Sequence, residues 1–481
     1  MKLLRIICLL TGMLYVLAAG AQPGPPDQLT FDAFRQIVRF NHPVMMQSEL
    51  LIQSGESTVR AARGAFDPKI EGGLDQKFYK GTTYYDITNA QIKIPTILAA
   101  ELKAGYDLSN GQYLNPDQTT PDDGLIYAGV SLPLLQGLLI DERRSVLQQA
   151  KAFRGFTIAE QGAMVNDLLL DAYSQYWTWW SAQEKVRIIS EMTDLAEQRK
   201  QAVKSRAIEG DRPFIDTLEA HLQVQLRQQQ LQEMRALEVK SRLTLSTFMW
   251  RSNGMENDPS PLLIEAGITS SARDLSGPYP EGLDTLALRF EQLVTSIAQN
   301  HPLALSYFYS LEALDAELRW KQQKLLPKLN VNYHFLNEPA GVAAGDDATR
   351  FSTNNYKWGF DFSFPVFIRE ARGERELQLI KIRDKQLERE QKINELRNKA
   401  RAAMAQIELL SSQYAIAREN LANYETLFIA ERTRFFNGES SLFLINQREM
   451  AYVDARNKVI DIALKIHLTE MELRWALNAF N

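Results

Sequence analysis

The sequence predicts a mixed α and β chain, internally duplicated, in which long antiparallel coiled-coil helices are joined to strands of a membrane β-barrel. Three observations predict this fold class. One segment alternates strictly between aromatic and polar or small residues, several short motifs recur in the same order in both halves, and two helical patterns each extend over nearly seventy residues. A small amount of β-structure is therefore expected to be joined to a large amount of helix.

The first residues have the pattern of a secretory signal peptide, which we expect to cover residues 1–21. Two basic residues precede an apolar stretch at residues 6–18, and residues 19–21 (Ala-Gly-Ala) provide a cleavage site with small side chains. Cys8, the only cysteine, lies inside the apolar stretch. The exported chain would therefore carry neither a thiol nor a disulfide.

Composition and charge exclude several classes of protein. With 45% hydrophobic and 23% charged residues, the chain has the composition of a folded protein, and its net charge of −5 offers no footprint for nucleic acid. After the N-terminus, no apolar run reaches the roughly eighteen residues that a membrane-spanning helix requires. Any contact with a membrane would therefore be made by strands.

Two tripeptides mark an internal duplication. The motif Asn-His-Pro occurs at residues 41–43 and again at 300–302, and a proline that opens a strand-like segment follows each copy, at Pro68 and Pro327. Both pairs are separated by 259 positions. We expect each asparagine to adopt the left-handed conformation at a helix end, each histidine to cap the turn, and each proline to open the next helix.

The two copies differ in length in the strand region. Pro133 and Pro365 close this region in the two halves and are separated by 232 positions, so the first copy is 259 − 232 = 27 residues longer. The additional residues would form either an extra hairpin near residues 92–106 or a long loop. Gly210 and Gly438 are separated by 228 positions, so the helices that precede them differ by only about one turn.

The helical patterns complete each repeat. We expect the first repeat at residues 22–255, a connector rich in Pro, Gly, Ser and Asp at 256–283, and the second repeat at 284–481. Within the repeats, helices are predicted before the strands, after the strands and beyond the glycines, at residues 43–63, 141–208 and 213–250 and at 302–325, 370–436 and 441–480. At ~1.5 Å per residue, each of the longest pair would measure ~100 Å.

A seam of apolar residues runs along the longest helices. Its members alternate by three and four positions, which is the spacing of coiled coils, and its alanines permit close approach of neighbouring helices. The seam consists of Ile393, Leu396, Ala400, Ala403, Ile407, Leu410, Tyr414, Ala417, Leu421, Tyr424 and Phe428, and in the first half of Ala182, Ile189, Ala196 and Val203. An isolated antiparallel coiled coil would explain the helices but not the aromatic strands.

The aromatic strand lies at residues 356–364 and is closed by Pro365. Successive side chains of a strand point to opposite faces, so one face is wholly aromatic and the other carries Lys, Gly, Asp and Ser. Residues 329–335 alternate in the same way. This pattern favours a membrane barrel, in which the aromatic residues face lipid. The predicted lipid-facing residues are Tyr356, Trp358, Phe360, Phe362 and Phe364.

Motifs of enzymes are missing from the sequence. It contains no Gly-Lys pair of a phosphate-binding loop, no His-Glu-x-x-His and no Gly-x-Ser-x-Gly. The five histidines have no metal-ligand spacing, and a cluster of aromatic residues at 177–180 is expected to pack rather than to bind a ligand. Asp141 and Glu142 are expected to begin a helix, where the helix dipole favours acidic residues. We therefore expect no catalytic residue, no metal and no cofactor.

The ordered duplication resembles the TolC-like outer membrane efflux proteins. The resemblance rests on two copies of Asn-x-Pro, a helix, a proline entering a strand, (Leu/Phe)-Pro leaving one, a very long helix and a glycine turn, and it covers the whole exported chain. It implies a homotrimer whose protomers share one transmembrane β-barrel in outer membrane lipid and one periplasmic helical tunnel. It also implies docking to a periplasmic adaptor and to an inner-membrane RND or ABC transporter, and passive export of small molecules.

Barrel closure supports association on independent grounds. Two or three hairpins cannot close a barrel alone, because an open edge in lipid leaves backbone groups without hydrogen bonds. Cyclic association of copies would close that edge. Two alternatives remain open: the same fold could serve type I protein secretion, or the chain could be a soluble periplasmic coiled-coil interaction protein.

The family resemblance also implies functional residues. The turns that contact the adaptor correspond to residues 207–214 and 435–442, and they include Gly210, Asp211, Gly438 and Glu439. The acidic pore constriction of the family corresponds to Leu444 and Gln447 in the second repeat, whereas Asp216 and Glu219 keep the acidic character in the first. Phe435 and Ser440 stand at the positions of a tyrosine and an arginine that help to hold some members of the family closed.

Overall fold

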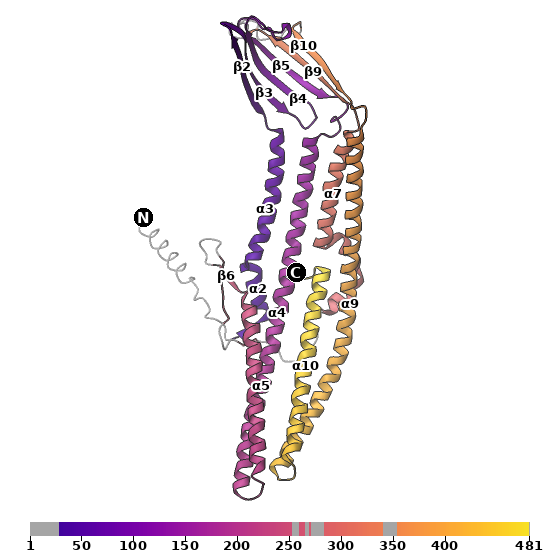
Figure 1. Cartoon of the computed structure of the whole chain (residues 1–481). Helices are drawn as coiled ribbons and strands as arrows, with labels where there is room; N and C mark the ends of the chain where they lie inside the picture. The colour runs from indigo at the N-terminus through magenta and orange to yellow at the C-terminus, as the bar shows by residue number, and fades with distance from the viewer. Residues whose placement is uncertain (1–27, 253–258, 265–268, 271–282, 340–353, 481) are drawn as a thin grey trace, which may run out of the picture. The chain divides into compact units, whose positions relative to one another are not determined.

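The computed structural model describes residues 28–252, 259–264, 269–270, 283–339 and 354–480 (Figure 1). The predicted signal peptide and most of the predicted connector lie outside these residues. The described chain forms two compact units. The described residues of the first unit lie within 1–45, 167–289 and 399–481, and those of the second lie within 46–166 and 290–398. Each unit therefore combines segments from both halves of the sequence.

The same order of elements occurs twice along the chain. In the first half it consists of α2 (Phe31–Asn41), α3 (Pro43–Arg63), β2 (Lys69–Tyr79), β3 (Thr82–Pro95), β4 (Glu101–Asn110), β5 (Leu125–Pro133), α4 (Glu142–Ile208) and α5 (Ile215–Ser246). In the second half it consists of α6 (Leu283–Asn300), α7 (Pro302–Gln323), β9 (Lys328–Asn337), β10 (Tyr356–Ser363), α9 (Arg369–Phe436) and α10 (Leu442–Leu477). The long helices α4 and α9 have 67 and 68 residues, as predicted.

Among the described residues between the halves, three segments form short strands. They are β6 (Trp250–Ser252), β7 (Pro259–Pro261) and β8 (Thr269–Ser270), of which β6 pairs with β7. β8 pairs in parallel with β1 (Gln28–Leu29). Within the described residues, no helix combines the length and the apolar character needed to cross a membrane.

The duplicated turns show how a histidine before proline joins two helices. His42 and His301 are extended, with φ near −70° and −76°, and each imidazole Nδ1 accepts a hydrogen bond from the backbone two residues later, at 3.2 Å. The predicted capping role of both histidines is therefore confirmed. The predicted left-handed conformation of Asn41 and Asn300 was wrong, since both asparagines are the last residues of their helices. The proline disfavours the helical conformation of the residue before it, so the histidine, not the asparagine, leaves the helix.

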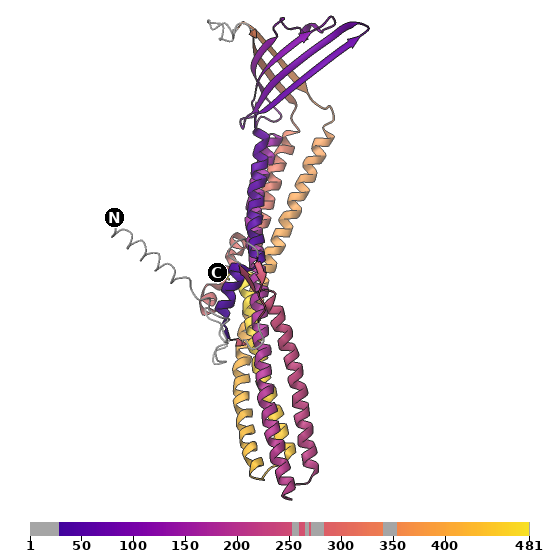
Figure 2. The same cartoon turned by 90° about the vertical axis from the view of Figure 1, so that its left-hand side faces the viewer.

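Six strands of the second unit form one antiparallel sheet in the order β10-β9-β5-β4-β3-β2 (Figures 1 and 2). The strands β9 and β10 pair as the sequence predicted, with Trp358 opposite Tyr333. The additional residues of the first repeat form β3 and β4, which pair with each other and with their neighbours β2 and β5. Of the two alternatives, the extra hairpin is therefore correct.

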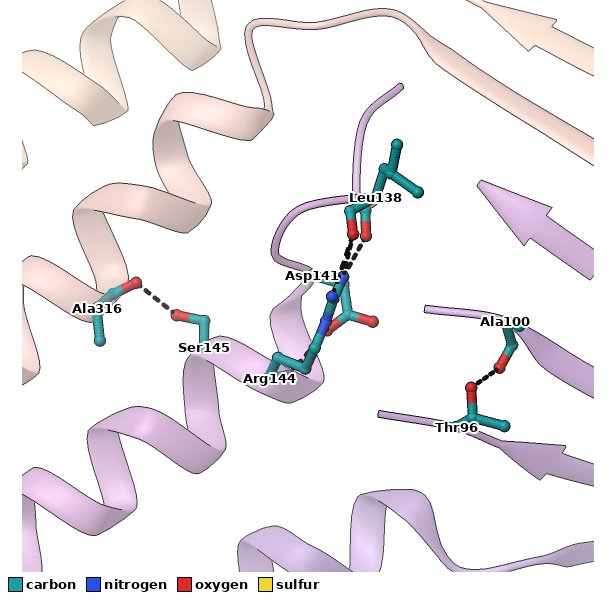
Figure 3. A network of polar contacts seen from close by, with 8 residues as sticks. Thr96, Ala100, Leu138, Asp141, Arg144, Ser145 and Ala316 are labelled. Atoms are coloured by element: carbon teal, nitrogen blue, oxygen red, sulfur yellow. Dashed lines mark hydrogen bonds and ion pairs between the residues drawn. The ribbon is translucent and has the colours of Figure 1, made fainter. Parts of the chain in front are cut away.

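Polar contacts fix the start of α4 beside the sheet (Figure 3). The Asp141 carboxylate accepts a hydrogen bond from the Arg144 backbone N–H at 2.8 Å, which caps the helix as the acidic residues there predicted. The Arg144 side chain returns to the carbonyls of the preceding turn, including Leu138 at 3.1 Å. The Ser145 hydroxyl donates to the Ala316 carbonyl of α7 at 2.9 Å, so α4 and α7 are joined where the sheet begins.

The predicted seam is buried over most of its length. Its side chains from Ile393 to Ala417 are at most 8% exposed, and the four seam residues of α4 are at most 5% exposed. The prediction that the seam is buried was wrong at Tyr424, whose side chain is 39% exposed. A tyrosine tolerates such a position because its hydroxyl can reach water. The aromatic cluster packs as expected, with Trp179 and Trp180 fully buried.

Candidate functional site

Two hairpin turns in the first unit carry the predicted adaptor-contact residues. Gly210 follows α4 and Gly438 follows α9, and both have positive φ angles, of +85° and +83°. The N–H of Asp211 donates to the Arg206 carbonyl at 2.9 Å, and the N–H of Glu439 donates to the Arg434 carbonyl at 2.8 Å. Each glycine also donates to a carbonyl three residues earlier, which completes a Schellman motif. Both long helices therefore end in the same glycine-dependent way.

Arg206 links the two hairpins. Its guanidinium donates hydrogen bonds to the carbonyls of Phe435 and Phe436, the last two residues of α9. These carbonyls lie in the last turn of α9, where the Phe435 carbonyl also accepts from the Gly438 N–H, and the C-terminal end of a helix dipole attracts a cation. A side chain of the α4–α5 hairpin thus caps a helix of the α9–α10 hairpin.

Arg212 makes a second link between the same hairpins. Its guanidinium lies 4.6 Å from the centre of the Phe435 ring, and it donates a hydrogen bond to the Ser440 carbonyl at 3.0 Å. It also forms an ion pair with Asp216 at 3.5 Å. Arg212 therefore contacts both positions that the family resemblance marked for a closing contact, and it neutralises one of the predicted constriction acids.

The predicted constriction residues occupy equivalent positions in the two repeats. Asp216 and Glu219 lie on the first two turns of α5, and Leu444 and Gln447 lie 228 positions later on the first two turns of α10. Gln447 is exposed, whereas the other three are half-buried. The Leu444 backbone N–H donates to the hydroxyl of Ser441, which caps α10. Their role in a constriction stays a prediction.

Apolar side chains surround the two turns and face water. Ile208, Phe214 and Ile215 are each about 70% exposed at the first turn, and Phe443 is 68% exposed at the second. Phe435, in contrast, is only 1% exposed. Exposed apolar residues that gather at one place often mark a surface that contacts a partner.

A buried cluster of charged residues joins α4, α5 and α10 further from the turns. Glu449 is bound by Arg199 and by Arg227, the second at 3.1 Å, and all three side chains are at most 5% exposed. Arg199 also donates to Asn446 at 2.9 Å, and Arg227 donates to Gln230 at 2.8 Å. Two cations thus share one anion in the interior between these helices.

The sheet of the second unit has one apolar and one polar face. The pairing registers show which residues of the other five strands lie on the same face of the sheet as the aromatic residues of β10. On this apolar face lie Ile70 and Leu74, Ile92 and Ile94, Leu102 and Tyr106, Val130 and Leu132, Val331 and Tyr333, and Tyr356, Trp358, Phe360 and Phe362. On β10, Trp358, Phe360 and Phe362 are more than 60% exposed, and Phe364, just beyond the strand, is 42% exposed. That lipid covers this face stays a prediction.

The polar face carries a row of lysines that crosses the sheet. Directly opposed residues on the six strands form this lysine row, which consists of Lys69, Lys93, Lys103, Gly129, His334 and Lys357. Carboxylates bind two of its members: Glu71 lies 2.5 Å from Lys93, and Glu101 lies 3.5 Å from Lys103. The polar face therefore presents charged groups of both signs.

The sequence predicted the glycine turns at Gly210 and Gly438 but not the contacts that Arg206 and Arg212 make between the hairpins. The positive φ of Gly210 and Gly438 follows from their place after long helices, but the contacts of Arg206 and Arg212 depend on how two hairpins pack. The buried cluster left a signal that was overlooked. Arg199, Arg227 and Glu449 stand at core positions of their helices, between buried residues three or four positions away.

Comparison with known proteins supports the family resemblance. Residues 293–479 match the family model described as outer membrane efflux protein. No curated protein matches the chain. At 9–12% identity, the similarity to the following solved structures shows the fold alone.

Three of these structures illustrate the fold. The CmeC outer membrane channel of Campylobacter jejuni is 12% identical, with a TM-score of 0.62 over 93% of this chain and 85% of that chain. The MtrE outer membrane channel of Neisseria gonorrhoeae, in its open state, is 12% identical, with a TM-score of 0.62 over 92% and 88%. The outer membrane protein VceC of Vibrio cholerae is 9% identical, with a TM-score of 0.61 over 93% and 95%.

Proposed function

We propose that the chain, whose residues 293–479 match the outer membrane efflux protein family model, is the outer-membrane channel of a tripartite efflux system. It exports small molecules passively while docked to a periplasmic adaptor and an inner-membrane RND or ABC transporter, and it catalyses no reaction. The observation that carries this proposal is the six-stranded sheet with one mainly apolar face and one mainly polar face.

The two faces suit a barrel wall between lipid and water. A transmembrane barrel presents apolar side chains outward and polar side chains to its lumen, in strict alternation along each strand. The sheet follows this alternation on its six strands with a few exceptions, such as the hydrogen-bonded pair Gln76 and Asp86 on the apolar face. Among the described residues it ends in two open edges, β2 and β10. Open edges are not tolerated in lipid, so copies of the chain must pair to close them. A homotrimer in the outer membrane, with a large periplasmic portion formed by the helices, meets this requirement.

The hairpin turns suit contact with an adaptor. Gly210, Asp211, Gly438 and Glu439 are exposed, and large apolar side chains stand around them. A partner that covers these side chains removes their apolar surface from water, which favours docking. The turns themselves are held rigidly by their Schellman motifs, so the docking surface is preformed.

The contacts of Arg212 suit a resting state in which the hairpins are held together. Docking would separate the α4–α5 hairpin from the α9–α10 hairpin. Arg212 binds Phe435 and Ser440 across that gap, beside the contacts of Arg206 with Phe435 and Phe436. In this proposal the constriction is formed by Asp216, Glu219, Leu444 and Gln447. Since Arg212 neutralises Asp216, closure depends on contacts within each copy as well as on those between copies.

Membrane fractionation and single-channel recording test the proposal. The protein should be recovered in the outer membrane as a trimer and should conduct in planar bilayers. The variant Arg212→Gln should raise the resting conductance, whereas Arg235→Gln, at an exposed arginine of the same helix α5, should leave it unchanged. Recovery in the soluble periplasm, or a stable monomer that conducts, would overturn the proposal.

The phenotype of a deletion strain separates efflux from secretion. Loss of an efflux channel should sensitise cells to small toxic compounds. If the strain instead fails to export one polypeptide and keeps its resistance, the same fold serves type I secretion.

A further inference from the structure

The two open edges of the sheet have complementary directions. All neighbouring strands in the order β10-β9-β5-β4-β3-β2 are antiparallel, and their number is even, so β2 and β10 run in opposite directions. The β10 edge of one copy can therefore pair with the β2 edge of another without breaking the antiparallel pattern. An odd number of strands would force a parallel pair at each junction.

We propose that β10 of one copy pairs with β2 of the next copy in one defined register, so that each copy contributes six strands to a shared barrel. The inference rests on the proposed function, from which it takes the association of copies. It adds the strand number, the pairing edges and the register. The partner at each edge is thus a second copy of this chain.

The registers within the sheet show that its two edges are staggered. A row of directly opposed residues starts at Ile70, the second residue of β2, and ends at Tyr356, the first residue of β10. The row consists of Ile70, Ile92, Ala104, Ala128, Phe335 and Tyr356. Almost all of β2 therefore lies on one side of the row, and almost all of β10 lies on the other. A sheet that closes into a barrel needs such a stagger.

Two registers with matching faces let β2 of the next copy cover all eight residues of β10, because β2 is three residues longer. The proposed register opposes Tyr356 with Gln76 and Ser363 with Lys69, and the side-chain pairs described below favour it over the register shifted by two residues. The stagger is then 76 − 70 = 6 residues per copy. With ~3.4 Å per residue and ~4.8 Å between strands, six residues give ~20 Å of stagger across ~29 Å of sheet. The resulting strand tilt of about 35° agrees with the ~35–45° typical of barrels.

The side chains that meet in this register are complementary. On the apolar face, Phe360 would oppose Gly72, an arrangement in which an aromatic ring covers a glycine that has no side chain of its own. On the polar face, Lys357 would oppose Asp75, and opposite charges stabilise a cross-strand pair. A register shifted by two residues would instead oppose Lys357 with Lys77, and like charges disfavour that pair.

One pair in the proposed register has like charges, Asp361 opposite Glu71. Both carboxylates already have partners within their own copy. Glu71 is bound to Lys93 at 2.5 Å, and Asp361 accepts a hydrogen bond from Asn332 at 2.9 Å. These contacts offset the repulsion between the two carboxylates.

Six strands per copy make the outer-membrane opening wide. Three copies give 6 × 3 = 18 strands, and barrels of about this size leave an aqueous channel through the membrane. With ~4.8 Å between strands and the tilt derived above, the barrel diameter is about 35 Å between backbone walls. The barrel then passes hydrated solutes without selecting them by size, and selection occurs in the helical part of the channel.

Disulfide cross-linking tests the edge pairing. Cys8 is the only cysteine, so a Cys8→Ala background contains no other thiol. In this background, Asp75→Cys is combined with Lys357→Cys, and the outer-membrane fraction is oxidised mildly and separated without reductant. Directly opposed residues of antiparallel strands lie ~4.5–5.5 Å apart at their Cα atoms, which a disulfide can bridge. Within one copy these residues lie on opposite edges of the sheet, so a disulfide joins two copies.

Two control pairs fix the register and the face. The variant Lys77→Cys with Lys357→Cys tests the register shifted by two residues, and Leu74→Cys with Lys357→Cys places the thiols on opposite faces. We expect covalent trimers from the Asp75 pair, at least tenfold more than from either control. Native mass spectrometry of each preparation reports whether the trimer has formed.

The outcomes separate this inference from the proposed function. An intact trimer in which neither the Asp75 pair nor the Lys77 pair cross-links would overturn the edge pairing and leave the proposed channel standing. Efficient cross-linking of the Lys77 pair alone would overturn the register and the tilt derived from it. The absence of any trimer in the outer membrane would overturn both proposals.

Discussion

The buried cluster around Glu449 allows a stability prediction whose order of effects follows from its charges. Two arginines, Arg199 and Arg227, share this one carboxylate, so the cluster carries a net charge of +1 in the interior. The variant Glu449→Gln keeps the shape of the side chain and removes the only anion. Two guanidinium groups at most 5% exposed then face each other without a counter-charge. Breaking a buried ion pair in this way costs about 3–5 kcal/mol.

Removal of one arginine should cost less. In Arg227→Met, the carboxylate keeps Arg199 as its partner and the cluster becomes neutral. The variant loses the hydrogen bonds of Arg227 to Glu449 and Gln230, and hydrogen bonds to charged groups contribute about 1.5–3 kcal/mol each. Relief of the repulsion between the two arginines offsets part of this loss, so we expect a net cost of about 1–3 kcal/mol. Replacement of all three residues by Met, Met and Leu should be nearly neutral, because buried ion clusters often contribute no more than apolar packing.

Hydrogen exchange of the full-length protein in detergent measures these differences. Amides of α4, α5 and α10 around the cluster report the free energy of local opening. For Glu449→Gln we expect exchange to be faster by at least about a hundredfold, since each tenfold change corresponds to about 1.4 kcal/mol. Equal acceleration in Arg227→Met and Glu449→Gln would refute the charge argument. A triple variant as unstable as Glu449→Gln would refute it as well.

Three further predictions concern the sheet, the constriction and the first histidine turn. Trp358→Arg should impair assembly of heat-resistant oligomers more than Asp361→Arg, because a cation at a lipid-facing midplane position costs about 2–4 kcal/mol; equal assembly on gels would contradict the assignment of faces. Leu444→Asp should raise the resting conductance in single-channel recordings through repulsion between copies, and an unchanged conductance would place the constriction elsewhere. Burial lowers the pKa of His42, so the unfolded chain binds a proton more readily and stability falls below about pH 6.5. The melting temperature of His42→Asn should therefore drop less between pH 7.5 and 5.5 than that of the parent, and equal drops would contradict this.

Periodicity made most of the fold predictable. Strict alternation at residues 356–363 determines which side chains share a face, and the pairing of β9 with β10 follows from two such segments near each other in the chain. The three-and-four spacing of the α9 seam predicts burial because only one stripe of a helix can face its neighbours. These patterns depend on local backbone geometry, which a sequence specifies directly.

The remaining features depend on contacts between segments far apart in the sequence. The 27 additional residues could form a loop or a hairpin, because the length difference alone does not determine whether β3 and β4 find partners in a sheet. Arg206 and Arg212 contact residues more than 220 positions away, and no local pattern points to these partners. The asparagines before the histidine turns were misassigned because the steric effect of proline on the preceding residue outweighed the tolerance of asparagine for the left-handed conformation.

The lysine row has a consequence for the electric field along a pore. Its members are directly opposed, so the row runs perpendicular to the strands. In a barrel whose strands are tilted by about 35° from the membrane normal, the row is inclined by about 35° to the membrane plane. Lys69 and Lys357 are five strand spacings apart, so they lie at depths in the membrane that differ by about 14 Å. The positive charges then wind along the wall as a spiral instead of forming a collar at one level. An anion in transit would meet them one after another, and no single depth would act as a trap or a barrier.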